Sequence, residues 1–204
     1  MKFYVLASLI IFVLVIFHNV RKSGNHFNAE EQSFWEKERL ANEVRRKSLD
    51  GLDYVKIPLD KLPMNLMMDD PKVAECLRII NELSLQPIVN LTGLTNTDLK
   101  LEYGTANITV LTEYDQNYTL LASTLQQWAD LLYTQNHTAE VGQILEFAVS
   151  TRTDVSRSYD MLSDIYVANS QFDKINDLIA TAETLNSLNR DVILRHLKQK
   201  TDHF

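Results

Sequence analysis

The residues that could hold a metal or act as nucleophiles are few and scattered along the chain. A zinc or other metal site needs histidine, cysteine or carboxylate ligands at short, regular spacings, or brought together by the fold. None of the five histidines stands at such a spacing from another or from the single cysteine, Cys76: His18, His26, His137, His196 and His203. We therefore expect no metal site and no cofactor.

Cys76 lies in an apolar helical pattern rather than beside groups that would activate its thiol. Val73, Leu77 and Ile80 share one face with it at helical spacing. Nothing near it in the sequence would lower the pKa of the thiol. We interpret Cys76 as a core residue, and a lone cysteine cannot form an internal disulfide.

Catalytic and phosphate-binding motifs are missing from the sequence. It contains no H-E-x-x-H helix, no G-x-S-x-G elbow and no glycine-rich phosphate loop. Carboxylates are plentiful, but an acid–base pair also needs a pocket that shifts one pKa. We predict that the protein is not an enzyme, with no catalytic residues and no small-molecule substrate.

Length and charge indicate one acidic domain with a short basic start. The chain has 204 residues, 20 basic and 27 acidic, and the three basic residues among the first 22 are Lys2, Arg21 and Lys22. Such a length suits one packed domain plus an anchor. Because phosphate backbones are bound through Lys and Arg, the acidic remainder argues against a nucleic-acid partner.

The segment from Phe3 to Val20 is almost wholly apolar and predicts a membrane anchor over residues 1–22. Eighteen helical residues at about 1.5 Å each span most of a bilayer core. A cleaved signal peptide is the alternative, but the run reaches Arg21 without a small-residue cleavage site. Most nearby basic residues follow the anchor, so the positive-inside rule predicts a single-pass membrane protein with a cytoplasmic C-terminal domain.

Four Asn-x-Thr sequons argue for the opposite orientation, because glycosylation occurs on secreted-side domains. They begin at Asn90, Asn107, Asn117 and Asn136. Asn and Thr also gather at helix starts, where they cap free N–H groups. We interpret the four as unmodified turn and cap residues, and keep a secreted-side glycoprotein as an alternative.

Residues 23–70 predict a juxtamembrane helix followed by an extended linker. Residues 34–49 combine strong helix formers with a sparse apolar stripe. Pro58 and Pro63 prevent a continuous helix over 53–68, and this apolar stretch is expected to dock on the helical body. Its methionines could instead form an adaptable partner surface.

The rest of the chain predicts helices and short turns, with an internal repeat. Asp70 and Pro71 are suited to the N-cap and first position of a helix that runs to about residue 85. From residue 98 onward there is no proline, and apolar residues keep a helical period to about 200. An offset of 34 residues aligns large with large and small with small residues: Leu125 with Tyr159, Trp128 with Leu162, Ala129 with Ser163, Leu132 with Tyr166, Val141 with Ile175, Leu145 with Ile179, and Ala148 with Ala182.

This pattern resembles the tetratricopeptide repeat, a 34-residue helical hairpin. The resemblance implies repeats near 122–154 and 155–188, a capping helix at 190–200 and a helical domain over 71–204, in which 71–120 form a degenerate first layer. Ala129 and Ser163 replace the usual glycine, and the closing proline is absent. A generic helical bundle would reproduce part of the pattern. The anchor, linker and repeats together are also similar to uncharacterised small membrane proteins of Firmicutes.

The resemblance further implies a groove that binds a protein or peptide. Its outward positions here would be Ser123, Gln126, Asp130, Tyr133, Arg157, Asp160 and Asp164. Their acidic character favours a basic or polar partner. We therefore expect a membrane-tethered adaptor or scaffold, with residues 3–20 in the bilayer. The alternative is a structural or self-associating subunit of a membrane complex.

Overall fold

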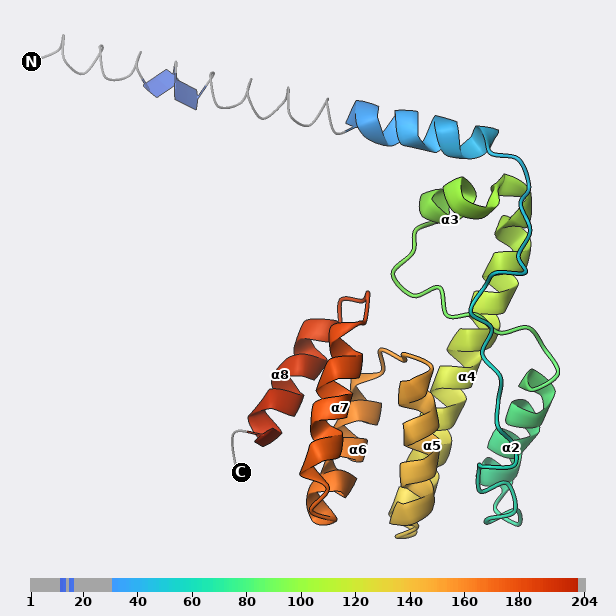
Figure 1. The fold of residues 1–204 in the computed structure, drawn as a ribbon, viewed down its shortest axis with the longest axis vertical. Helices are drawn as coiled ribbons and strands as arrows, with labels where there is room; N and C mark the ends of the chain where they lie inside the picture. The colour runs from blue at the N-terminus through green and yellow to red at the C-terminus, as the bar shows by residue number, and fades with distance from the viewer. Residues whose placement is uncertain (1–11, 14, 17–30, 202–204) are drawn as a thin grey trace, which may run out of the picture. The chain divides into compact units, whose positions relative to one another are not determined.

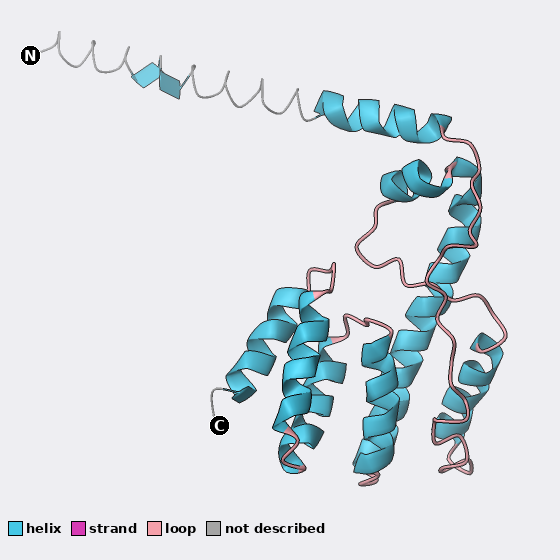
Figure 2. Ribbon diagram, in the orientation of Figure 1, coloured by secondary structure: helices cyan, strands magenta, loops and turns pink. Residues whose placement is uncertain are grey.

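The fold is known from a computed structural model that describes residues 12–13, 15–16 and 31–201. Within these ranges all regular elements are helices and no strand forms, which confirms the all-α prediction (Figures 1 and 2). An isolated antiparallel bridge joins Tyr54 and Val89. A search of the same ranges finds no helix with the length and apolarity needed to cross a bilayer. The predicted anchor lies outside the described residues except for 12–13 and 15–16, so it stays a prediction.

The chain divides into two compact units. The first consists of Met1–Ser48 and Thr95–Ile108, and the second of Leu49–Leu94 and Thr109–Phe204. The described helices of the first unit are residues 31–43, α3 (Asn96–Tyr103) and the short 3-10 helix η1 (Thr105–Asn107). The second holds α2 (Pro71–Leu83) and α5 to α8, together with all but the first residue of α4 (Ile108–Thr134).

Two salt bridges connect helix 31–43 to α3 within the first unit. The Lys37 ammonium lies 2.7 Å from the Asp98 carboxylate, and Lys100 pairs with Glu38. Glu38 also accepts a hydrogen bond from the Thr97 hydroxyl, at 2.6 Å. Ala41 is fully buried beside these pairs. The charged face of this helix is therefore partly committed to contacts inside the protein.

A helix forms within the predicted range 34–49, as expected, but it ends at residue 43. Beyond it, the Lys47 amide donates to the Tyr103 carbonyl, at 3.0 Å, instead of to the preceding turn. The buried Asn107 donates to the Lys47 carbonyl, at 2.8 Å, and accepts from the Arg46 side chain, at 3.0 Å. These contacts to a distant segment replace the helical hydrogen bonds that residues 44–49 would otherwise make.

We expect the attachment of helix 31–43 to α3 to weaken in acid. The hydrogen bonds that Asp98 accepts from Lys37 and Thr95 lower the pKa of its carboxyl from 3.8 to about 2. A lowered folded-state pKa stabilises the fold above pH 3.8, and this contribution is lost as the pH falls towards 2. An NMR titration of the Asp98 carboxyl in Lys37→Met is expected to show its pKa returning towards 3.8. An unchanged Asp98 titration in this variant would show that the Lys37 contact does not form in solution.

Helix α2 begins and packs as its sequence indicates. The Asp70 carboxylate caps it by accepting from the amides of Lys72 and Val73, and Pro71 occupies the first turn. Its buried face contains Val73, Cys76, Leu77, Ile80 and Leu83. Burial raises the pKa of the Cys76 thiol, which is consistent with its interpretation as a core residue.

The proline-containing linker docks on the helices of the second unit, as expected. Leu62 is buried, and six other side chains pack partly buried against the same core: Val55, Ile57, Leu59, Met64, Leu66 and Met67. Of the three methionines in this linker, only Met68 is largely exposed, at 58%. Most of the methionine cluster therefore serves packing, and several turns interrupt the extended backbone that the prolines predicted.

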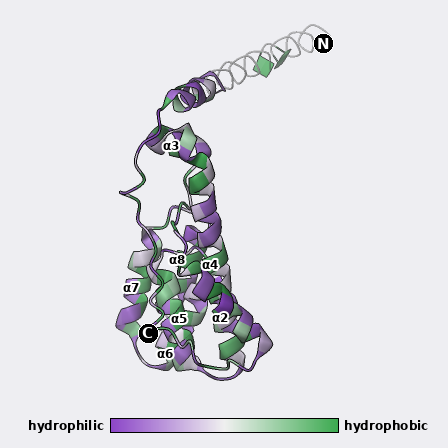
Figure 3. Ribbon diagram, turned by 90° about the vertical axis from the view of Figure 1, so that its right-hand side faces the viewer, coloured by the Kyte–Doolittle hydropathy of each residue, from purple (hydrophilic) through white to green (hydrophobic). Residues whose placement is uncertain are grey.

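The second half of this unit is a row of helices joined by short turns (Figure 1). After α4 come α5 (Thr138–Ser150), α6 (Ser156–Ala168), α7 (Phe172–Glu183) and α8 (Arg190–Thr201). One hydrophobic core runs through α2 and α4 to α8, with Trp128 and Tyr159 among its largest fully buried side chains. Figure 3 shows hydrophobic and hydrophilic residues alternating along α2 and α4, as expected for amphipathic helices.

Candidate functional site

The 34-residue offset seen in the sequence reappears in the backbone of two turns. Asn136, after α4, and Ser170, after α6, both have a positive φ, 63° and 56°. The amide of the following residue reaches back to the helix in each turn, from His137 to the Leu132 carbonyl at 3.1 Å and from Gln171 to Tyr166 at 2.8 Å. This is the Schellman arrangement that ends helices. Asn136 and Ser170 therefore have a left-handed backbone conformation and end α4 and α6. Neither is the N-cap residue of the helix that follows, α5 or α7.

Replacing Ser170 with glycine is expected to stabilise the protein by about 1 kcal/mol, since a side chain disfavours the left-handed conformation that glycine adopts freely. Asn136→Gly is expected to gain less, because asparagine tolerates this conformation better. Urea unfolding would measure both. The matched control is Ala168→Gly in the last turn of α6, where glycine is expected to destabilise by about 0.5–1 kcal/mol. Destabilisation by Ser170→Gly would mean that the turn differs in solution.

The helix-pair residues matched by the offset are almost all buried in both copies. Leu125, Trp128, Ala129 and their counterparts Tyr159, Leu162 and Ser163 are all 0–1% exposed. Ile179 differs, because it is only partly buried whereas Leu145 is fully buried. Helix α8 continues the register, since Arg190 stands 34 residues after Ser156, the first residue of α6. Its buried residues are Ile193 and Leu197.

Polar side chains join α4 to α6 at two positions predicted for partner binding. The Gln126 carbonyl accepts from the Ser158 hydroxyl at 2.7 Å, and its amide donates to Asp130 at 3.0 Å. Asp130 also pairs with Arg157 at 2.8 Å. The expectation that Gln126 points outward is wrong, because the residue is only 8% exposed and its amide bonds to Ser158 and Asp130.

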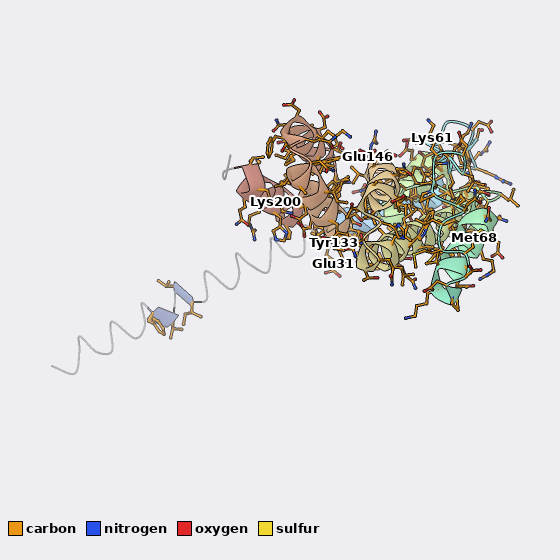
Figure 4. The ribbon with its side chains drawn as sticks, turned by 90° about the horizontal axis from the view of Figure 1, so that it is seen from below. Glu31, Lys61, Met68, Tyr133, Glu146 and Lys200 are labelled. Carbon is orange, nitrogen blue, oxygen red and sulfur yellow. The ribbon has the colours of Figure 1, made fainter. Side chains whose placement is uncertain are left out.

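The equivalent positions of α6 are joined to α8 in the same way. Asp160, which corresponds to Gln126, lies 3.2 Å from the His196 ring nitrogen. Asp164, which corresponds to Asp130, pairs with the Lys200 ammonium at 2.7 Å. Figure 4 shows Lys200 at the α8 side of the helix row. The acceptor positions of α4, Gln126 and Asp130, thus recur in α6 as Asp160 and Asp164. Their partners do not recur with the same offset.

The carboxylates of the predicted acidic groove are therefore engaged by side chains of the same protein, two by the charged Arg157 and Lys200 and one by the His196 ring. Arg157, His196 and Lys200 face the carboxylates of Asp130, Asp160 and Asp164. Of these acids only Asp164 keeps a widely exposed side chain, at 62%. Ser123 and Tyr133, also predicted for the groove, lie exposed on α4, Tyr133 at 44%. Charge alone thus gives weak support for a basic partner.

An open, mainly apolar depression of about 510 Å³ lies on α4 beside these residues. We call it the α4 depression, and its lining is Ser123, Gln126, Gln127, Asp130, Leu131, Thr134 and Val155. Three of the predicted residues contribute to it. Leu120, 44% exposed, stands one turn before Ser123 on the same helix and extends the apolar surface.

A second depression, of about 270 Å³, lies among α5, α6 and α7. Glu146 accepts from Lys174 and from the Tyr166 hydroxyl, each at 2.8 Å, and the Lys174 ammonium lies 4.9 Å from the Tyr166 ring centre. Burial opposes ionisation of Glu146, but these hydrogen bonds keep the pKa of its carboxyl below the ordinary value. Burial also raises the pKa of Tyr166. We interpret this cluster as structural, because its polar groups form hydrogen bonds with one another and connect α5, α6 and α7.

A polar cleft of about 370 Å³ was not predicted from the sequence. Four separate segments line it, with residues such as Asp53, Lys56, Asn90, Thr92, Arg152 and Asn186. Gly93 approaches Asn186 here so closely that an added Cβ would lie 1.9 Å from the Asn186 carbonyl oxygen. No local motif marks such a cleft, because each segment contributes only a few residues.

Three of the sequon asparagines donate hydrogen bonds from their side-chain amides to backbone carbonyls: Asn117 donates once, to Pro87 at 3.0 Å, and Asn90 and Asn107 each donate twice. The Asn90 amide nitrogen donates to the carbonyls of Thr151 and Arg152, at 2.9 and 3.1 Å. The Asn107 nitrogen donates to those of Lys47 and Tyr103, at 2.8 and 2.7 Å. An N-linked glycan replaces one amide hydrogen, so it is incompatible with both hydrogen-bond pairs.

The described residues contain no group of three or more histidine, cysteine or carboxylate side chains placed to hold a metal ion. No family model, curated protein or solved structure matches this chain. The resemblances to the tetratricopeptide repeat and to membrane proteins of Firmicutes therefore rest on the residue pattern. The α4 depression is the cavity among the described residues that is lined by three of the residues predicted for partner binding, Ser123, Gln126 and Asp130.

Proposed function

We propose that this protein is a membrane-tethered interaction module, which holds a protein partner near the bilayer through the surface of its tetratricopeptide-like helices. The single observation that carries the proposal is the α4 depression, an open apolar surface on a helix whose other face is committed to the core. Contiguous exposed apolar surface of this kind marks interaction sites in soluble domains. An enzyme is disfavoured because no catalytic motif occurs in the sequence.

The membrane tether is supported by the apolar run from Phe3 to Val20 and by its four described residues. Phe12, Val13, Val15 and Ile16 are helical, and their exposed fractions are 65%, 52%, 52% and 46%. Four apolar side chains exposed within little more than one helical turn are costly in water and favourable in lipid. Tethering would raise the effective concentration of the partner at the membrane.

The partner is expected to insert apolar side chains and to add polar contacts at the rim. Carbon atoms supply most of the surface of the α4 depression, although five of its seven lining residues are polar, and two of these, Ser123 and Gln127, are exposed. The acids that suggested a basic partner already contact Arg157, His196 and Lys200 of the same protein. We therefore expect burial of apolar surface to supply most of the binding free energy, and polar contacts to fix the orientation of the partner.

A photo-reactive residue at Gln127 of the full chain in its native membrane would test this function. We expect one discrete cross-linked protein, and we expect Ser123→Arg to reduce its yield at least about tenfold, because a charged side chain would enter the apolar surface. Gln143, exposed on α5 and outside the lining, is the matched control position. The same product from Gln143, or an undiminished yield with Ser123→Arg, would rule out the α4 depression as the docking surface.

A further inference from the structure

The N-terminal part of helix 31–43 exposes two large aromatic side chains that the fold does not use. Phe34 is 53% exposed and Trp35 is 61% exposed. Their rings pack edge to face, with centroids 5.4 Å apart. The Trp35 indole N–H lies 3.5 Å from the Glu31 carboxylate, at the outer limit of a hydrogen bond. The pair therefore forms an apolar surface with one polar edge.

The sequence before this pair indicates what covers it. The apolar run that we propose as the membrane tether ends at Val20, only 14 residues before Phe34. Tryptophan and other aromatics at the ends of membrane spans prefer the interface, where the ring body meets acyl chains and the indole N–H meets headgroups. The exposed apolar residues Phe12, Val13, Val15 and Ile16 of the run are the nearest described residues before helix 31–43.

We infer that Phe34 and Trp35 insert into the interfacial layer of the bilayer and hold helix 31–43 at the membrane surface. This inference rests on the proposed membrane tether, but it concerns a separate contact. The occupant is the lipid interface, and another protein or a second copy of the chain would be an opposing result.

The charges of helix 31–43 indicate that this contact does not depend on anionic lipids. The helix carries four acidic residues, Glu31, Glu36, Glu38 and Glu43, against the basic residues Lys37 and Arg39. Lys37 pairs with Asp98, at 2.7 Å, and Arg39 with Glu43, at 2.8 Å. No cluster of free cations on this helix thus faces the lipid headgroups, so insertion depends on the aromatic rings.

The test is fluorescence of the full chain in phosphatidylcholine vesicles that carry bromine either near the lipid carbonyls or near the acyl-chain ends. Trp35 and Trp128 are the only tryptophans, and Trp128 is fully buried. The Trp35 signal is obtained from Trp128→Phe, and independently as the difference between the natural chain and Trp35→Phe. We expect shallow bromine to quench it at least about twofold more than deep bromine. Adding anionic lipid is expected to leave the ratio unchanged.

Vesicle flotation of the same samples separates this inference from the tether. We expect both the natural chain and the double variant Phe34→Ala/Trp35→Ala to float. Flotation without bromine quenching, with Trp35 accessible to aqueous iodide, would overturn the inference and leave the tether standing. A Trp35 signal that changes with protein-to-lipid ratio but not with bromine would also overturn it, in favour of self-association. Failure of the natural chain to float would refute the tether and the inference together.

Discussion

Replacing Trp128 with alanine is expected to destabilise the second unit by about 3–5 kcal/mol, the usual cost of removing a large aromatic from a packed core. Trp128 is fully buried in the C-terminal part of α4, in the core shared with α2 and α5 to α8. Its loss leaves a cavity that rigid neighbouring helices fill only in part. For a domain of this size, the melting temperature is expected to fall by roughly 10 °C.

Two further variants sharpen this expectation. Trp128→Phe is expected to cost clearly less than Trp128→Ala, because the indole nitrogen has no hydrogen-bond partner among the described residues. Removing an unsatisfied buried donor recovers part of what the smaller ring loses. Trp35→Ala, at a 61% exposed position, is expected to change stability by less than about 0.5 kcal/mol. Chemical unfolding followed by circular dichroism measures all three, and equal effects at the two tryptophans would contradict the fold.

Gly93→Ala is expected to destabilise the second unit by about 2–3 kcal/mol, for two reasons that add. Gly93 has a φ of 85°, which strains any residue with a Cβ. The new Cβ would also stand 1.9 Å from the Asn186 carbonyl oxygen, a backbone atom that moves only with its loop. Moving the two segments apart to relieve this clash would break the hydrogen bond from the Asn186 side-chain amide to the Gly93 carbonyl, at 3.2 Å. Hydrogen exchange in the loop between α7 and α8 is expected to rise.

Gly142→Ala provides the matched control, with the opposite sign. Gly142 lies inside α5, and an added Cβ would meet no atom within 4 Å. Alanine in a helix interior is expected to stabilise by about 0.5–1 kcal/mol, because glycine loses more backbone entropy on folding. If both substitutions destabilised alike, the close approach of Gly93 to Asn186 would not be the cause.

The sequence alone predicted the helices well, because helix signals act over a few residues. Asp70 and Pro71 mark the start of α2, and the apolar period of α4 to α8 identifies the buried face of each helix. The 34-residue offset also predicted which residues are equivalent, down to the paired turns at Asn136 and Ser170. These signals are local, so they are readable without knowing which helices meet.

The binding surface could be predicted only in part, because its residues depend on partners far along the chain. Gln126 and Asp160 lie at helical positions that a repeat places outward, yet Ser158 and His196 occupy their polar atoms. His196 is 36 residues from Asp160, and no periodicity within α6 indicates it. The polar cleft has the same origin, since its lining comes from four separate segments.

Composition and periodicity thus determined the all-helical class and the core faces, since burial of apolar side chains at a 3.6-residue period leaves few alternatives. Only the tertiary structure decided that helix 31–43 ends where it does, because Asn107 holds Lys47 from 60 positions away. It also decided which carboxylates stay open to a partner, because a charge is neutralised by whichever cation the fold places beside it.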